Sequence, residues 1–182
     1  MKVVESGSLA GVLLLEPKVF GDARGFFFES YNRKTFAQAT GLDVEFVQDN
    51  HSCSSKNVLR GLHYQVRQTQ GKLVRVCAGE IWDVAVDLRR SSASFGRWTA
   101  ARLDAVSRRM LWIPAGFAHG FIALSERAEV LYKSTDYYAP EHERTLLWND
   151  PALAIPWPLA GEPVLADKDR RGTPLGAADT FA

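Results

Sequence analysis

Short apolar runs bounded by turn residues recur along most of the chain. Residues 58–65 show the pattern most clearly, because apolar Val58, Leu59 and Leu62 are interleaved with polar Arg60 and His63. A strand that lines a cavity explains both kinds of residue, since one side packs in a core and the other carries polar groups. An edge strand with its polar side chains in water is the alternative. The rest of the chain is read around this stretch.

The same reasoning predicts a series of strands. They cover residues 9–15, 26–31, 44–50, 58–65, 72–78, 80–88, a stretch beginning at 95, 109–113, 119–124 and 128–135. Residues 52–56 are expected as a loop, and residues 78–80 as a hairpin turn. Residues 33–40 are expected as a helix between an Asn32 cap and Gly41. Residues 148–161 are rich in proline and glycine, and the C-terminal segment from about 148 to 182 is expected to be mostly irregular.

Residues 80–88 alternate well between two faces. One face is apolar, whereas the other carries Asp83 and Asp87 beside Ile81 and Ala85. That second face fits either a polar interior or a solvent side. Many short strands with turn signals at about 8- to 12-residue spacing indicate an all-β protein. We predict one domain over residues 1–182, a jelly-roll barrel of antiparallel strands with a few short helices.

Composition narrows the function classes. The chain has 182 residues, 46% of them apolar, and a net charge of +1. This balance gives no general attraction to nucleic acid or to an anionic membrane. No apolar run reaches about 18 residues and no signal peptide is evident. Cys53 and Cys77 are expected as reduced thiols. We therefore expect a cytoplasmic protein without nucleic-acid or membrane partners.

Residues 114–119 form a Pro-x-Gly-x-x-His turn that resembles the second motif of the cupin superfamily. The first cupin motif would supply two histidines and a downstream acid. Here the matching place reads His63-Tyr64-Gln65, and no acid follows before Lys72. Too few nitrogen and oxygen ligands are assembled for a transition metal. We expect no metal. Taken alone, His119 would be a hydrogen-bonded histidine in a turn.

Seven short motifs occur in a fixed order along the chain. They are FGDxRGxFxE at 20–29, FVQDN at 46–50, LRGLHYQ at 59–65, GKLVR at 71–75, IPxGFxHGF at 113–121, YK at 132–133 and DKD at 167–169. Together they resemble the dTDP-4-dehydrorhamnose 3,5-epimerase family over residues 16–172.

The resemblance implies an epimerase that needs no cofactor. It would invert C3 and C5 of dTDP-4-dehydro-6-deoxy-D-glucose by removing a proton beside the C4 ketone and returning one to the opposite face. A base, an acid and a cation at the developing oxyanion suffice for this chemistry. Alternatives are an epimerase of one carbon only and a nucleotide-sugar binding jelly roll without catalysis. A metal-dependent oxygenase is disfavoured by the missing ligands.

The resemblance also assigns roles. His63 would be the base, paired with Asp169; Tyr132 would be the acid, and Lys72 the cation near the C4 oxygen. Without the family, these last three would be a solvated acid, an ordinary strand tyrosine and a solvated lysine. Substrate-binding residues would be Arg24, Phe27, Glu29, Gln48, Asn50, Arg60, His119, Tyr138, Glu143 and Lys168.

Three further expectations follow. The family is a homodimer in which the partner supplies Arg24 and Glu29, so the N-terminal residues to about 50 should serve the dimer. Asp83 is a candidate for supporting the site from behind. Arg60 and His63 have opposite parity in a strand, so both can face the cavity only if Gly61 introduces a bulge.

Overall fold

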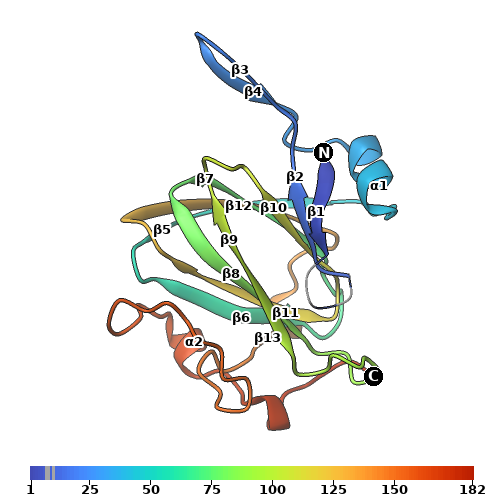
Figure 1. Cartoon of the computed structure of the whole chain (residues 1–182). Coiled ribbons are helices and arrows are strands. Elements are labelled where there is room, and N and C mark those ends of the chain that lie inside the picture. The colour runs from blue at the N-terminus through green and yellow to red at the C-terminus, as the bar shows by residue number, and fades with distance from the viewer. Residues whose placement is uncertain (7–8, 10) are drawn as a thin grey trace.

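The computed structural model describes residues 1–6, 9 and 11–182, and its barrel consists of two antiparallel β-sheets that face each other (Figure 1). Across the first sheet lie β1 (Lys2–Ser6), β2 (Leu13–Glu16), β10 (Met110–Ile113), β7 (Lys72–Ala78), β12 (Arg127–Ser134) and β5 (Gln48–Ser55). Across the second lie β13 (Glu143–Thr145), β6 (Leu59–Gln65), β11 (Phe117–Ala123), β8 (Glu80–Asp87) and β9 (Trp98–Asp104). The jelly-roll prediction is confirmed.

Two elements near the N-terminus lie outside this sandwich. Strands β3 (Val19–Asp22) and β4 (Gly25–Phe28) form a hairpin that projects away from the barrel (Figure 1). Helix α1 (Arg33–Thr40) follows, as predicted. The Asn32 side chain accepts from the first-turn amides, and Gly41 closes the helix at φ +74°.

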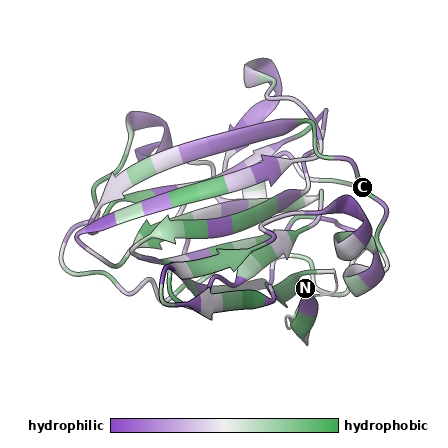
Figure 2. Ribbon diagram, turned by 90° about the horizontal axis from the view of Figure 1, so that it is seen from above, coloured by the Kyte–Doolittle hydropathy of each residue, from purple (hydrophilic) through white to green (hydrophobic). Residues whose placement is uncertain are grey.

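Three apolar clusters hold the layers together. The first fills the space between the sheets, with residues such as Val74, Ile81 and Phe121. The second lies under the C-terminal segment, on the outer side of the five-stranded sheet. The third joins Phe36 of α1 to Trp112 on the outer side of the other sheet. Figure 2 shows the resulting alternation of hydrophobic and hydrophilic residues along the strands.

The polar face of β8 turns out to be interior. Ile81 and Ala85 belong to the cluster between the sheets, and Asp83 and Asp87 on the same side of the strand are fully buried. Of the two possibilities that the sequence left open, the polar interior is the one observed. Part of the barrel is therefore lined by charged and polar side chains.

Several sequence-based expectations are wrong in detail. Residues 52–55, expected as a loop, continue strand β5, which pairs with β12 along its whole length. Ser52 and Ser54 face inward whereas Cys53 and Ser55 are exposed, so pairing with β12 overrides the low strand propensity of serine. The expected hairpin at 78–80 is also wrong. There β7 and β8 belong to different sheets, and Gly79 at φ +74° carries the chain from one layer to the other.

Several observed strands also begin at other residues than predicted. The strand expected at 9–15 begins at Leu13, and Ala10 lies outside the described residues. The strand expected at 44–50 begins only at Gln48, and β1, β3 and β13 were not foreseen. Residues 148–161 contain no helix or strand, as predicted.

The remaining helical segments are short: η1 (Pro140–His142), α2 (Asp167–Arg170) and η2 (Leu175–Ala177). Among the described residues, no helix has the length and apolar character required to cross a membrane.

Candidate active site

A cavity of about 360 Å³ opens at the polar end of the barrel. Both sheets contribute to its walls, and the segment around α2 closes one side. The residues that line it are Gln48, Asn50, Ser52, Arg60, His63, Gln70, Lys72, His119, Gly120, Phe121, Tyr132, Tyr138, Glu143, Ala166, Lys168 and Asp169. Most of the residues predicted for the site are therefore brought together.

A bulge in β6 turns both Arg60 and His63 toward this cavity. His63 pairs with His119, whereas Arg60 pairs with Phe121, so three steps on β6 match two on β11. Gly61, between them, has φ +123°, and a Cβ there would lie 2.5 Å from the Cα of Gly120. Only glycine fits this position. The bulge expected from the parity of Arg60 and His63 is present.

His63 and Asp169 form a close pair although 106 residues separate them. The Nε2–H of His63 donates to Oδ1 of Asp169 at 2.6 Å. Asp169 is buried inside an otherwise exposed charged turn, so the alternative of a solvated acid is wrong. Burial lowers the pKa of His63 below its ordinary value, while the Asp169 carboxylate acts in the opposite direction. The ring nitrogen Nδ1 remains for another proton.

Tyr132 and Lys72 come from the opposite sheet. Burial raises the pKa of the Tyr132 phenol, so the group keeps its proton at neutral pH. Burial also lowers the pKa of Lys72 to about 8, against the pull of Glu143 and Asp83. Its ammonium side chain is buried at the cavity wall, so the alternative of a solvated lysine is wrong.

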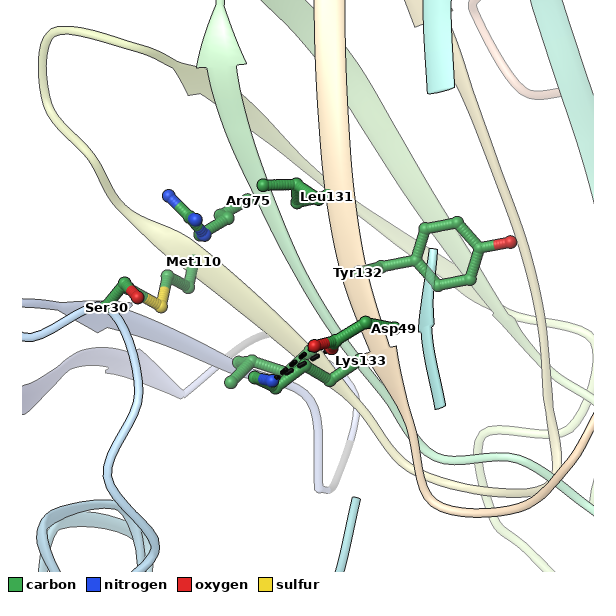
Figure 3. Close-up of a pocket in the computed structure, with 8 residues that line it drawn as sticks. Ser30, Asp49, Arg75, Met110, Leu131, Tyr132 and Lys133 are labelled. Carbon is green, nitrogen blue, oxygen red and sulfur yellow. Dashed lines mark hydrogen bonds and ion pairs between the residues drawn. The ribbon is translucent and has the colours of Figure 1, made fainter. Parts of the chain in front are cut away.

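The Tyr132 ring points away from the side chains on the outer face of the same sheet (Figure 3). There Arg75, Met110 and Lys133 border a smaller cavity of about 140 Å³, in which Lys133 is paired with Asp49. Alternation along β12 therefore separates the Tyr132 side chain from that outer face.

A second group of polar residues gathers at the mouth of the main cavity. The Tyr138 hydroxyl donates to Glu143 at 3.3 Å, and Lys168 donates to both oxygens of Glu143 at 2.9 Å. The backbone amide of Tyr138 donates to Gln48 at 2.9 Å, which in turn donates to Asn50 at 2.9 Å. The exposed Tyr138 ring and the Lys168 cation form a surface that suits a base and a phosphate.

Another histidine–aspartate pair lies behind the cavity wall. His119 Nε2 lies 3.0 Å from each carboxylate oxygen of Asp83, and both residues are buried. His119 itself lines the cavity, whereas Asp83 does not.

Three predicted substrate-binding residues do not reach this cavity within the chain. Arg24 and Phe27 lie on the projecting hairpin, where Arg24 is paired with Asp22 and the Phe27 ring is 73% exposed. Glu29 accepts hydrogen bonds from Asn32 and Thr35 at the start of α1. The structure therefore places Arg24 and Phe27 on a projecting hairpin and Glu29 at its base, beside α1.

Some lining residues were missed by the sequence analysis. Ser52 shares the parity of Gln48 and Asn50, and Phe121 shares that of His119. Extending both strands with their period of two would have found them. Ser52 was overlooked because that segment was taken for a loop. Gln70 lies between strands and carried no such signal.

No group of three or more metal-ligating side chains occurs in the described part of the chain. Arg60, Lys72 and Lys168 also line the cavity, and their cationic side chains are poor ligands for a divalent ion. The expectation of an enzyme without metal stays a prediction, tested below.

The fold and the cavity define a class: a cupin-like jelly roll with a histidine–carboxylate pair opposite a tyrosine, which suits proton transfer beside a carbonyl group. Comparison with known proteins is more specific. The family model described as dTDP-4-dehydrorhamnose 3,5-epimerase matches residues 6–176. The chain belongs to this family, as its motifs indicated.

Individual relatives agree. The chain is 62% identical to the dTDP-4-dehydrorhamnose 3,5-epimerase of Pseudomonas aeruginosa, over 96% of each protein. A crystal structure of the Legionella pneumophila dTDP-6-deoxy-D-glucose-3,5-epimerase with dTDP-4-keto-L-rhamnose matches with TM-score 0.95 and 48% identity, covering 98% of this chain and 94% of that one. A 3'-monoepimerase from Streptomyces bikiniensis, solved with dTDP-quinovose, matches with TM-score 0.89 and 34% identity, covering 98% and 89%.

The chain is thus an isomerase, an epimerase of C3 and C5 in dTDP-4-dehydro-6-deoxy-D-glucose. The predicted family and activity are confirmed.

Proposed function

We propose that His63 accepts the protons removed from C3 and C5 and that Tyr132 donates its own phenolic proton to each carbon from the other side of the sugar. The observation that carries this proposal is their placement. His63 extends from β6 in one sheet and Tyr132 from β12 in the facing sheet, and both line the same cavity. A planar enolate between them would meet a base on one face and an acid on the other.

The protonation states support these directions. Because burial lowers the pKa of His63, the ring is neutral at pH 7 and can accept a proton. Once protonated, the imidazolium is stabilised by Asp169 at 2.6 Å. Because burial raises the pKa of Tyr132, its phenol is protonated and can donate.

Lys72 supplies the positive charge for the enolate oxygen. Proton removal beside the ketone places negative charge on the C4 oxygen, and a buried cation stabilises it more strongly than one in water. With a pKa of about 8, Lys72 is mostly charged at neutral pH. Arg60 also lines this part of the cavity, held by a hydrogen bond from its Nε to Ser54 at 3.0 Å.

The mouth of the cavity would bind the nucleotide. Tyr138 is assigned to stack on the thymine ring, and Lys168 to pair with a phosphate, with Gln48, Asn50, Glu143 and His119 completing the contacts. Glu143 holds Lys168 and Tyr138 in place through the bonds described above.

The working unit is proposed to be a homodimer. The projecting hairpin carries Arg24 and Phe27 away from their own barrel, and Phe20, Phe26 and Phe27 are all exposed on it. A cation and aromatic rings on a free arm suit insertion at the mouth of a partner's cavity. The N-terminal segment would then complete the nucleotide site, with Glu29 near the base of the arm.

We place the enzyme in the cytoplasm. Cys53 and Cys77 are both unpaired and exposed, which fits a reducing compartment. A nucleotide-activated sugar as substrate fits the same compartment.

The reaction is tested by NMR of dTDP-4-dehydro-6-deoxy-D-glucose with the enzyme in D₂O. We expect deuterium to enter both C3 and C5, with inversion at both. Exchange at one carbon only would identify an epimerase of that carbon. Absence of exchange would refute the proposed function.

A further inference from the structure

Asp83 is a buried acid that takes no part in the proton-transfer steps proposed above. It lies on β8 with its side chain between the two sheets, and none of it is exposed. Both of its carboxylate oxygens lie 3.0 Å from Nε2 of His119, a residue of the cavity wall. One carboxylate therefore fixes the ring of His119 from behind, without touching the cavity itself.

The same carboxylate lies across the barrel from a second cavity residue. Lys72 is in the facing sheet and lines the same cavity as His119. Glu143 and Asp83 are the two acids whose charges oppose the effect of burial on its ammonium group. Glu143 is already paired with Lys168 at the mouth. Asp83, in contrast, lies inside the barrel, where little water screens its charge. A fully buried carboxylate is costly unless positive charge balances it.

We propose that Asp83 is a positioning residue of the active site, which orients His119 and balances the buried ammonium of Lys72. This inference rests on the proposed function, because it concerns the cation assigned to the enolate. It explains why an acid is kept inside the barrel beside the apolar residues Ile81 and Ala85.

Several charged or titratable groups surround Lys72, and each belongs to a different element. They are Glu143 on β13, Lys168 on α2, His63 on β6, His119 on β11, Tyr132 on β12 and Asp83 on β8. Lys168 and His63, when protonated, oppose the charge on Lys72, and Glu143 and Asp83 support it. Removing Asp83 leaves Glu143 as the supporting acid, against Lys168 and the effect of burial. The charged form of Lys72 should then be lost at lower pH.

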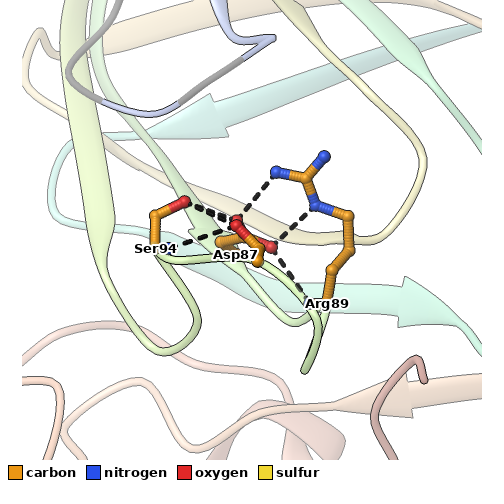
Figure 4. Close-up of polar contacts among 4 residues, drawn as sticks. Asp87, Arg89 and Ser94 are labelled. Carbon is orange, nitrogen blue, oxygen red and sulfur yellow. Dashed lines mark hydrogen bonds and ion pairs between the residues drawn. The ribbon is translucent and has the colours of Figure 1, made fainter.

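The test compares two buried aspartates of one strand. Asp87 lies four residues after Asp83 on the same side of β8 and is equally buried. Its carboxylate accepts hydrogen bonds from Arg89, Ser92 and Ser94 instead, a cluster outside the main cavity (Figure 4). Asp87→Asn is therefore a matched control, since it makes the same chemical change with different neighbours.

The measurement is kcat for the dTDP-keto sugar between about pH 6 and 10, a range that includes the pKa of Lys72 at about 8. In Asp83→Asn the alkaline limb should move to lower pH by about one unit, the effect of losing one nearby opposite charge. In Asp87→Asn the limb should stay in place even if the melting temperature falls. An unmoved limb in Asp83→Asn, or an equal movement in both variants, would overturn the inference.

A second measurement keeps the test decisive if Asp83→Asn folds poorly. Lys72→Met removes the cation that Asp83 is proposed to balance. Asp83→Asn should therefore destabilise this variant less than it destabilises the unaltered enzyme, measured by urea unfolding. If Asp83→Asn has the same effect in both backgrounds, Asp83 does not balance Lys72. The unfolding measurement requires no catalytic turnover. Failure of this inference can therefore be distinguished from failure of the proposed reaction, which would appear as an absence of deuterium exchange in the unaltered enzyme.

Discussion

His63 Nε2 and Asp169 Oδ1 lie 2.6 Å apart, with Asp169 almost completely buried at the end of a four-residue helix. Proximity of this kind fixes the orientation of the imidazole ring and leaves Nδ1 as its proton-accepting atom. The pair joins the C-terminal segment to the barrel. It makes residues beyond the last strand part of the site.

Asp169→Asn tests the role of this pair. The amide keeps the size of the side chain but removes the negative charge and can hold the ring in the wrong tautomer. We expect kcat to fall by roughly 100-fold or more while KM changes little. Asp167→Asn, two residues earlier and exposed, is the matched control and should behave as the unaltered enzyme. Full activity in Asp169→Asn would remove the pair from the mechanism.

The pH dependence of kcat should be bell-shaped. His63 must be neutral to act as base, and its pKa is lowered, so activity rises as pH increases through a value below about 6.5. Lys72 must be charged, and its pKa is about 8, so activity falls as pH increases beyond that value. Steady-state rates across this range would show both limbs. A rate that is still rising above pH 9 would contradict the role of Lys72.

Arg24→Ala tests whether the projecting hairpin serves a partner's cavity. We expect the Kd for dTDP to rise about tenfold, because a cation is lost from the nucleotide site. Arg33→Ala removes another exposed arginine, on α1, and should leave the Kd unchanged. Calorimetric titration measures both. Mixing Arg24→Ala with a Tyr132→Phe subunit should recover part of the activity if the sites are shared, and a monomer with full activity would refute the arrangement.

Chelation tests the expectation that the reaction needs no metal. Dialysis against EDTA should leave the rate unchanged, because lysine and tyrosine carry the charge and the proton in the proposed steps. A loss of activity that one specific divalent ion restores would show that the cavity binds a metal after all.

Part of the site could be predicted because its signals lie within short segments of the sequence. The motif at 59–65 combined Arg60 and His63 with Gly61, and strand parity raised a bulge at Gly61 as one of two possibilities, the one that the structure contains. Alternation also divided β8 correctly into two faces, although it left open which of them faces the interior. Residues with a period of two, flanked by turn signals, carry this information directly.

The features that the sequence could not predict depend on contacts between residues far apart in the chain. Pairing of β5 with β12 keeps Ser52 and Ser54 in a strand although serine is a weak strand former. Whether Gly79 closes a hairpin or crosses between sheets depends on which partners β7 and β8 find elsewhere. Burial of Asp169 in a charged turn likewise depends on contact with β6, a hundred residues earlier in the chain.

The central claim of the proposed mechanism is that His63 acts as the base and Tyr132 as the acid. His63→Ala should abolish both deuterium exchange and inversion, with a loss of about 100- to 10,000-fold. Tyr132→Phe keeps the ring and removes only the hydroxyl, so His63 can still form the enolate and return a proton to the same face. Tyr137→Phe, an exposed neighbour, is the matched control.

The most direct measurement is therefore NMR of the dTDP-4-keto sugar with Tyr132→Phe in D₂O. We expect solvent deuterium to enter the substrate while the configuration at C3 and C5 is retained. Inversion of both carbons at the rate of the unaltered enzyme would contradict the account, because another group would then be the acid and Tyr132 would only pack against the cavity wall.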